Sequence, residues 1–434
     1  MDMGQIENEM SYEDLLECAL ELGQRMVQSG AEVRRVEDTI TRVLHAYGAE
    51  SSEVFSISSL VLATVKWENG HKNTQSKRIN GFGINLRKLE LYNELARYIC
   101  RIRPGVTEIR ERLKEIARSR KRNWVDMAGY FLSSGALTIF FGGNFRDALA
   151  AGLIGLFVFL FDQFVKDPGA NKLVYTLFAC MVTGWLAILA VDVGLASNVN
   201  AIMIGDIMLF IPTLALCNSL KDVLHGDILT GVYRCVEAIM IAVAIAAGYF
   251  VADLTLGGIS GSVAAGTGNV PLPVQIITAV LGVVGFSIFF HIQRAKIWTA
   301  AIGGSISWVI YLMIFAWTEN LFFSNAVAAI AVCFFSEVMA RVLKAPANIF
   351  LIPAVIPLLP GNRFYMAVAS LISGDMQQFF EFAKATLSIL LGIEIGFMIA
   401  FILFTKSYGF FRDGYHRYQK KREHAEKIHN SNDV

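Results

Sequence analysis

The chain has 434 residues, of which 54% are hydrophobic and only 17% are charged. A soluble protein usually carries about a quarter charged residues, and here the deficit is confined to the segment 125–405. The net charge of +1 gives no electrostatic footprint for binding nucleic acid. Composition therefore predicts a polytopic α-helical membrane protein that carries a soluble attachment.

Residues 1–122 are predicted to form a cytoplasmic α/β domain. Apolar residues recur at helical spacing over 12–28 and 31–47, and β-branched residues fill 54–67. The following Glu68-Asn69-Gly70 favours a tight hairpin. The acidic start of the chain has no apolar stretch, so we expect no signal peptide and a domain that stays in the cytoplasm.

Ten apolar stretches follow this domain, each near the length that crosses a hydrocarbon core about 30 Å thick. With a cytoplasmic N-terminus, the inner loops and the tail hold most of the basic residues, as the positive-inside rule requires. The sequence thus predicts a multi-pass protein of the cell membrane with both termini cytoplasmic. The expected spans are 125–142, 148–165, 173–192, 199–217, 228–252, 274–291, 297–317, 321–340, 347–370 and 380–405.

The membrane region resembles itself when shifted by 148 residues. Pro212 then falls on Pro360, and Gly226-Asp227 falls on Gly374-Asp375. Because each unit has five spans, an odd number, the two units should be inverted relative to each other, as in many secondary transporters. The predicted divisions are the domain 1–122, a first five-helix repeat 123–253, an external glycine-rich linker 254–270, a second repeat 271–405 and a basic cytoplasmic tail 406–434.

Prolines predict interrupted helices at matching places in the two repeats. A proline inside a span removes a backbone hydrogen bond, and the freed backbone groups must be buried in protein or line a wet cavity. Such helix ends can bind the charged groups of a small substrate, although prolines can also simply kink a helix for packing. The predicted substrate-binding residues are Pro212, Asn218, Pro357, Pro360, Gly361, Asn362 and Arg363.

Ionisable residues within a span are functional candidates because they are costly in a bilayer. Asp206 and Glu394 have no evident local partner and are candidate proton carriers or substrate contacts. Arg234 and Glu237 lie on one helix face, as further coupling residues or as a structural ion pair. The six cysteines and seven histidines show no metal-ligand spacing, so no metal and no cofactor is expected.

Several segments resemble the threonine/serine exporter (ThrE) family, in the form that carries both halves in one chain. They are the run Gly30-Ala31-Glu32-Val33-Arg34-Arg35-Val36-Glu37, the run Phe140-Phe141-Gly142-Gly143 with Arg146-Asp147, and the proline-containing segments at 211–234 and 355–365. The resemblance implies ten spans, a cytoplasmic N-terminal domain and export of small metabolites. Split members of the family are associated with dicarboxylate export.

These observations predict a secondary transporter and no enzyme. We expect export of a small polar metabolite, threonine or serine first, driven by protons, with the lipid bilayer as its surroundings; the oligomeric state is left open. The alternatives are a dicarboxylate exporter, a receptor or channel with a cytosolic sensing domain, or a membrane-embedded hydrolase. The hydrolase would draw on Ser58, Ser59 and His71, which have no recognised spacing.

Overall fold

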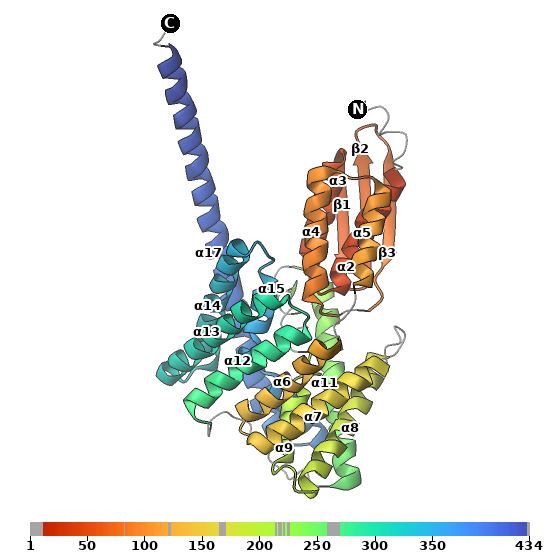
Figure 1. Ribbon diagram of the computed structural model, residues 1–434, viewed down its shortest axis with the longest axis vertical. Helices are drawn as coiled ribbons and strands as arrows, with labels where there is room; N and C mark the ends of the chain where they lie inside the picture. Colours follow the sequence, from red (N-terminus) through yellow and green to blue (C-terminus); the bar gives the residue numbers. More distant parts are fainter. Residues whose placement is uncertain are drawn as a thin grey trace.

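The computed structural model places a mixed N-terminal unit at one end of a helical bundle (Figure 1). It describes residues 12–81, 83–119, 123–164, 171–212, 215, 219, 222–223, 226–257 and 270–431, with backbone alone for Asn123 and 405–431.

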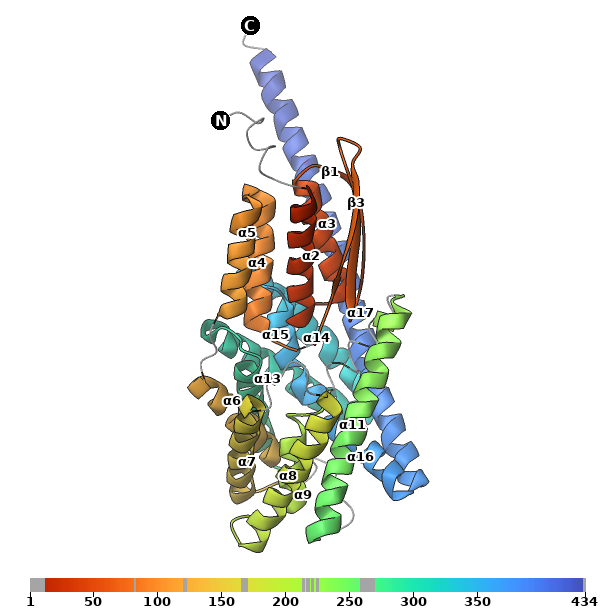
Figure 2. The same ribbon diagram turned by 90° about the vertical axis from the view of Figure 1, so that its right-hand side faces the viewer.

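The N-terminal unit, residues 12–118, is built in three layers (Figure 2). A three-stranded antiparallel sheet in the order β1-β2-β3 is covered on one face by α2 and α3, and α4 and α5 pack behind them. The elements are α2 (Tyr12–Gln28), α3 (Val33–Ala46), β1 (Ala49–Ile57), β2 (Leu60–Trp67), β3 (Lys72–Arg78), α4 (Leu86–Ile102) and α5 (Val106–Arg118).

The central strand β2 shows why this sheet forms. Its residues alternate between buried and partly exposed, with Val61, Ala63, Val65 and Trp67 facing the helices. The hairpin predicted at Asn69-Gly70 connects β2 to β3, and Gly70 has a positive φ of 80°.

Glycine also ends α2 and sets the direction of α3. Gly30 has φ +97°, a conformation that other residues rarely adopt, and the Ala31 N–H closes the helix by donating to the Met26 carbonyl at 3.0 Å. Helix α3 then buries the face that contains Val36, while Arg34 stays exposed. Its first turn is therefore free to face the helical bundle.

In the described part of the remaining chain, seven helices are long and apolar enough to cross a membrane, so this is a polytopic helical membrane protein. An eighth crossing is formed if α15 (Asn348–Ala354), the short 3-10 helix η1 (Ile356–Leu358) and α16 (Gly361–Ser373) count as one span with a 54° bend. The seven are α7 (Phe145–Phe164), α8 (Lys172–Asp192), α11 (Ile228–Leu256), α12 (Leu272–Phe289), α13 (Arg294–Thr318), α14 (Leu321–Val342) and the first part of α17 (Met376–Ser431).

The expected number of ten spans is not reached among the described residues. Helix α6 (Asn123–Phe140) occupies the first expected span, but Asp126, Ser133 and Ser134 make it too polar to be counted. Helix α9 (Val199–Ile207) starts the fourth span and ends after nine residues. Both helices pack against other helices of the bundle, α6 against α7 and α12, and α9 against α6 and α7.

Small residues bring the helices of the bundle close together. Helix α6 packs along α12, where a β-carbon on Gly285 would lie 2.6 Å from the Ser133 nitrogen. Helix α11 packs on α8, where a β-carbon on Gly248 would lie 2.5 Å from the Leu177 carbonyl oxygen. Helix α17 packs on α14 in the same way, with Gly396 facing the Ala326 carbonyl oxygen, again at 2.5 Å.

The N-terminal unit is bonded to the bundle at three points. The Leu86 N–H donates to the Phe290 carbonyl at 3.0 Å, Lys296 donates to the buried carboxylate of Glu90, and Asn348 donates to Glu32 at 3.1 Å. The end of α17 extends from the bundle on this same side (Figures 1 and 2).

Candidate functional site

The two predicted helix interruptions touch each other. Helix α9 ends at Ile207, before the half-buried Pro212, and the bend between α15 and α16 contains Pro357 and Pro360. A β-carbon on Gly361 would lie 2.7 Å from the Met208 sulfur. The turn that follows α9 therefore packs directly against the first residue of α16.

A cavity of about 100 Å³ lies beside this contact. A water molecule needs about 10–15 Å³ on this measure, so the space suits a small solute. Five separate segments of the membrane part supply its wall: Phe140 and Phe141 from α6, Trp308 and Tyr311 from α13, Asn325 from α14, Ile389 from α17, and Pro357, Leu358, Leu359, Pro360, Asn362 and Arg363 around the bend.

Three polar atoms in the residues that line this cavity are buried and have no hydrogen-bond partner among the described residues. They are Nε1 of Trp308 and the side-chain oxygens of Asn325 and Asn362. The Asn325 amide nitrogen donates to the Leu321 carbonyl at 2.7 Å, which orients that side chain. Since buried polar groups are normally hydrogen-bonded, these atoms indicate a bound polar molecule.

The bend between α15 and α16 supplies a positively charged side chain to the cavity, that of Arg363. Arg363 is partly exposed and forms no ion pair within the described residues. It stands in the first turn of α16, whose leading N–H groups lack acceptors within the helix and carry the positive end of the helix dipole. The cavity thus combines groups that attract a carboxylate with amide oxygens that accept hydrogen bonds.

Aromatic rings form the opposite wall. Trp308 meets Phe140 edge-on at a centroid distance of 4.8 Å and stacks on Tyr311 at 4.9 Å. Stacked aromatic side chains are rigid, and they exclude water from the apolar part of a bound molecule.

Asp206 lies near this cavity and is completely buried. Ser134 donates a hydrogen bond to one of its carboxylate oxygens, and the other oxygen has no partner among the described residues. Ser134 is six residues before Phe140 on α6, about 9 Å of helical rise. The structure therefore brings Asp206 within two helical turns of the cavity wall.

Glu394 lies elsewhere. It is 1% exposed, as expected for a residue in mid-span, but it lines a different cavity, of about 360 Å³, at the end of the bundle that meets the N-terminal unit. Sequence reasoning grouped Glu394 with Asp206, and the structure does not bring the two into one cavity.

Arg234 and Glu237 have partners on other elements. Arg234 donates to Asp222 at 2.7 Å, and Lys172 lies 3.3 Å from Glu237. These contacts bind α11 to the segment before it and to the start of α8. Asn218, predicted to contact substrate, lies outside the described residues.

Sequence reasoning missed the residues that α13 and α14 contribute. Asn325 is a polar residue inside an apolar span, a signal that could have identified it. Trp308 and Tyr311 look like ordinary aromatic packing in the sequence. Only the structure shows that these two aromatic residues line the cavity beside the bend.

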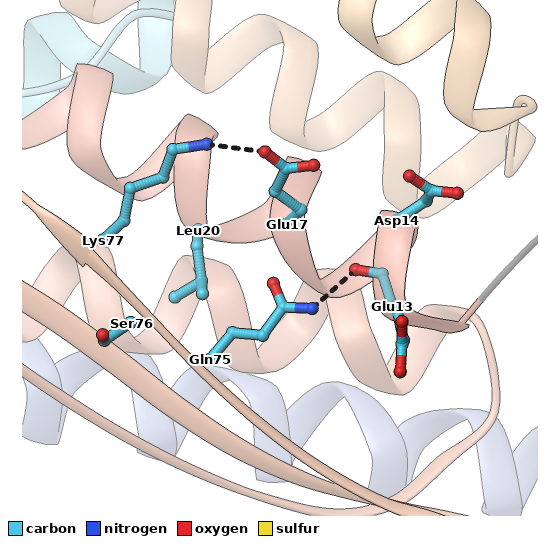
Figure 3. A pocket seen from close by; sticks show the side chains of 7 residues that line it. All are labelled: Glu13, Asp14, Glu17, Leu20, Gln75, Ser76 and Lys77. Carbon is cyan, nitrogen blue, oxygen red and sulfur yellow. Dashed lines mark hydrogen bonds and ion pairs between the residues drawn. The ribbon is translucent and has the colours of Figure 1, made fainter.

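The N-terminal unit has an open hollow of its own, about 420 Å³, between α2 and β3 (Figure 3). Its charged groups bind one another. Lys77 lies 3.3 Å from Glu17, and Arg110 donates to Asp14 at 2.6 Å. This hollow is best explained as the seam that holds β3 and α5 on α2.

The hydrolase alternative is not supported by the N-terminal unit. Ser58 and Ser59 lie in the turn before β2, and His71 lies after it. The strand has eight residues and so separates them by roughly 25 Å. They do not form a nucleophile–base pair.

The apolar helices, the bent span and the buried polar cavity are typical of membrane transporters. A family model described as "Putative threonine/serine exporter" matches residues 17–256, and a second, "Threonine/Serine exporter, ThrE", matches residues 275–403. The chain belongs to the threonine/serine exporter family, in the form that carries both models in one chain.

Curated relatives agree with this family. A "Threonine/serine exporter" of Corynebacterium glutamicum is 22% identical over 415 residues, which cover 89% of this chain and 82% of that protein. A "Probable threonine/serine exporter" of Mycobacterium tuberculosis is 20% identical, over 89% of this chain and 76% of that protein. A "Probable succinate transporter subunit YjjP" of Klebsiella aerogenes is 24% identical, over 57% of this chain and 93% of that protein. No solved structure matches the chain.

Proposed function

We propose that this protein is a secondary transporter that exports threonine or serine, and that the cavity at the bend before α16 binds the amino acid. The observation that carries this proposal is the composition of the cavity. Arg363 and the N-terminal end of α16 attract a carboxylate, while the oxygens of Asn325 and Asn362 can accept from an ammonium or hydroxyl group.

The same composition favours an amino acid over a dicarboxylate. A dicarboxylate needs positive groups at both of its ends, and Arg363 is the single charged residue among the described residues that line this cavity. The volume of about 100 Å³ also favours a small molecule. Succinate remains the second candidate because of the Klebsiella relative.

The two-repeat architecture belongs to this proposal, and three observations support it. The 148-residue shift carries Gly248 onto Gly396, and both glycines face a backbone carbonyl of the neighbouring helix, those of Leu177 and Ala326, which differ from the shift by one residue. The same shift carries Gly135 on α6 onto Val283 on α12, and these two residues pack against α7 and α13, which the shift also places in correspondence. The two family models meet between residues 256 and 275, close to the expected linker 254–270.

Alternating access follows from this arrangement, with the two halves moving around the meeting point of Met208 and Gly361. We place both termini in the cytoplasm, supported by the position of the N-terminal unit and the end of α17 on one side of the bundle and by the basic tail. Asp206 is the proposed proton carrier, because it is a buried acid one helix away from the cavity.

Counterflow in proteoliposomes tests the proposal. Vesicles loaded with unlabelled threonine should accumulate labelled threonine, and external serine should compete while succinate should not. Accumulation of labelled succinate instead of threonine would assign the protein to the dicarboxylate exporters. Absence of exchange with all three would remove the transport proposal.

A further inference from the structure

A cavity larger than the one at the bend lies where the N-terminal unit meets the bundle, and both parts are needed to form it. Its volume is about 360 Å³. The first turn of α3 supplies one wall with Glu32, Arg34 and Arg35, and α14, α15 and α17 supply much of the opposite wall. The hydrogen bond from Asn348 to Glu32 joins the two walls at 3.1 Å.

Charges of opposite sign are available on the two walls. Arg34 is exposed and Glu337, on α14, is half-buried, and neither forms an ion pair within the described residues. Arg35 is held by a 3.0 Å hydrogen bond to Asn93. Burial lowers the pKa of the Arg35 guanidinium, which nevertheless stays positive at neutral pH. The soluble wall thus offers two positive groups beside Glu32, and the rest of the lining carries the acidic residues Asp222, Asp227, Glu337 and Glu394.

A buried hydroxyl group adds an independent sign that this cavity holds a ligand. Ser336 lines the cavity, is 0% exposed, and its Oγ has no hydrogen-bond partner among the described residues. A serine inside a helix commonly donates to the carbonyl four residues earlier. Its hydroxyl therefore remains available to a polar molecule in the cavity.

We propose that this cavity is a second amino-acid site, where a zwitterion places its carboxylate at Arg34 and Arg35 and its ammonium at Glu337. The inference rests on the proposed function, because it uses the same cargo. The N-terminal unit then forms part of the transport path, at the entrance from the cytoplasm. Glu394 lines the same cavity and lies along the route inward.

Equilibrium binding of labelled threonine to the purified full-length protein tests this inference. The wild-type chain should bind two molecules of threonine. Arg34→Gln and Glu337→Gln should each leave one, Arg363→Gln should leave the other, and Arg34→Gln with Arg363→Gln should leave none. Asn362→Ala replaces Arg363→Gln if that variant does not elute as a single species.

Two matched substitutions control for general effects of lost charge. Arg42→Gln is on the same helix as Arg34, and Glu381→Gln is an exposed position on α17; neither lines this cavity, and both should keep two sites. A single wild-type site that Arg363→Gln removes and Arg34→Gln leaves intact would overturn the second site while the proposed function stands. No binding combined with no counterflow would overturn both.

Transport kinetics give a second readout. Glu337→Gln should raise the half-saturating threonine concentration about tenfold when threonine is presented from the side of the N-terminal unit, since a charged hydrogen bond is lost. Presentation from the other side should give the wild-type value. An equal change from both sides would contradict an entrance site.

Discussion

Arg363 is the residue that we propose to bind the carboxylate of the substrate. Its guanidinium lines the inner cavity beside the first turn of α16. We expect Arg363→Gln to weaken threonine binding at that site by about 1.5–3 kcal/mol, or roughly ten- to a hundredfold, because a charged hydrogen bond is removed. Counterflow at graded threonine concentrations measures this change.

A matched arginine outside the cavity controls for the loss of positive charge. Arg146 is exposed in the first turn of α7. Arg146→Gln should keep the wild-type half-saturating concentration, and Arg363→Lys should fall between the two. If Arg363→Gln transports like wild type, the carboxylate is not held at this place.

Asp206 offers a test of proton coupling. The Asp206→Asn side chain keeps the shape and can still accept from Ser134, but it cannot release a proton. We therefore expect exchange of internal and external threonine to continue, while accumulation driven by a pH gradient disappears. Asp192→Asn, at the exposed end of α8, serves as the control. Gradient-driven accumulation in Asp206→Asn would show that another group carries the proton.

Cys18 connects burial with chemical reactivity in the N-terminal unit. Burial raises the pKa of its thiol to about 11, and the residue is 2% exposed. The reactive thiolate is therefore scarce below pH 11. Maleimide labelling of the folded protein between pH 7 and 9 should leave Cys18 unmodified, and urea should expose it. Rapid labelling of the native protein at pH 7 would mean that α2 opens from the sheet.

At the scale of helices, Gly248 and Gly396 each allow a neighbouring helix to pack closely against the backbone. A β-carbon at either position would lie 2.5 Å from a backbone carbonyl oxygen of the neighbouring helix. Gly248→Ala and Gly396→Ala should each destabilise the bundle by about 1–3 kcal/mol through overpacking. Gly105→Ala, where no atom lies within 4 Å of the added carbon, is the control. Thermal unfolding in detergent that leaves both variants at the wild-type midpoint would contradict this packing.

The helices could be predicted well from the sequence because long apolar runs and prolines act locally. The expected 321–340 is observed as Leu321–Val342, and the interruption at Pro357 and Pro360 is confirmed by the 54° bend. The partner of Arg234 could not be predicted, because Asp222 lies twelve residues away across a turn. Helix α6 occupies the first expected span, but the hydrogen bonds that its buried Ser134 forms with Ala151 and Asp206 could not be predicted from the sequence.

At the scale of the whole molecule, the contact between Glu90 and Lys296 fixes the N-terminal unit to the bundle. Glu90 is 2% exposed and also accepts from Arg87 at 3.0 Å. Removing one partner of a buried ion pair costs about 3 kcal/mol or more. Glu90→Gln should therefore increase deuterium exchange in α4 and in the α12–α13 turn.

The reversed pair Glu90→Lys with Lys296→Glu should recover part of this protection, and it separates the ionic contact from a general loss of folding. Glu94→Gln, one turn further along α4, controls for the loss of a carboxylate. Unchanged exchange in Glu90→Gln would mean that the backbone contact between Leu86 and Phe290 is sufficient to hold the unit.

The sequence alone could not predict which residues would line the two cavities. The inner one joins Phe140 to Arg363 and the outer one joins Arg34 to Glu394, residues that are separated by more than half of the chain. Such neighbours are set by the packing of whole helices. The proline pattern indicated Arg363, but nothing local indicated that α3 would complete a binding surface with α14.

The three hydrogen bonds at Phe290, Lys296 and Asn348 all attach the N-terminal unit to the second half of the bundle, while its peptide chain continues into α6 of the first half. If the two halves rock against each other, the N-terminal unit would move as one body with the second half and change its position relative to the first half. The orientation of the N-terminal unit relative to the first half would then report the conformational state of the transporter. Distances between a dye on the sheet and a dye at the far end of α8 would record each turnover in single molecules.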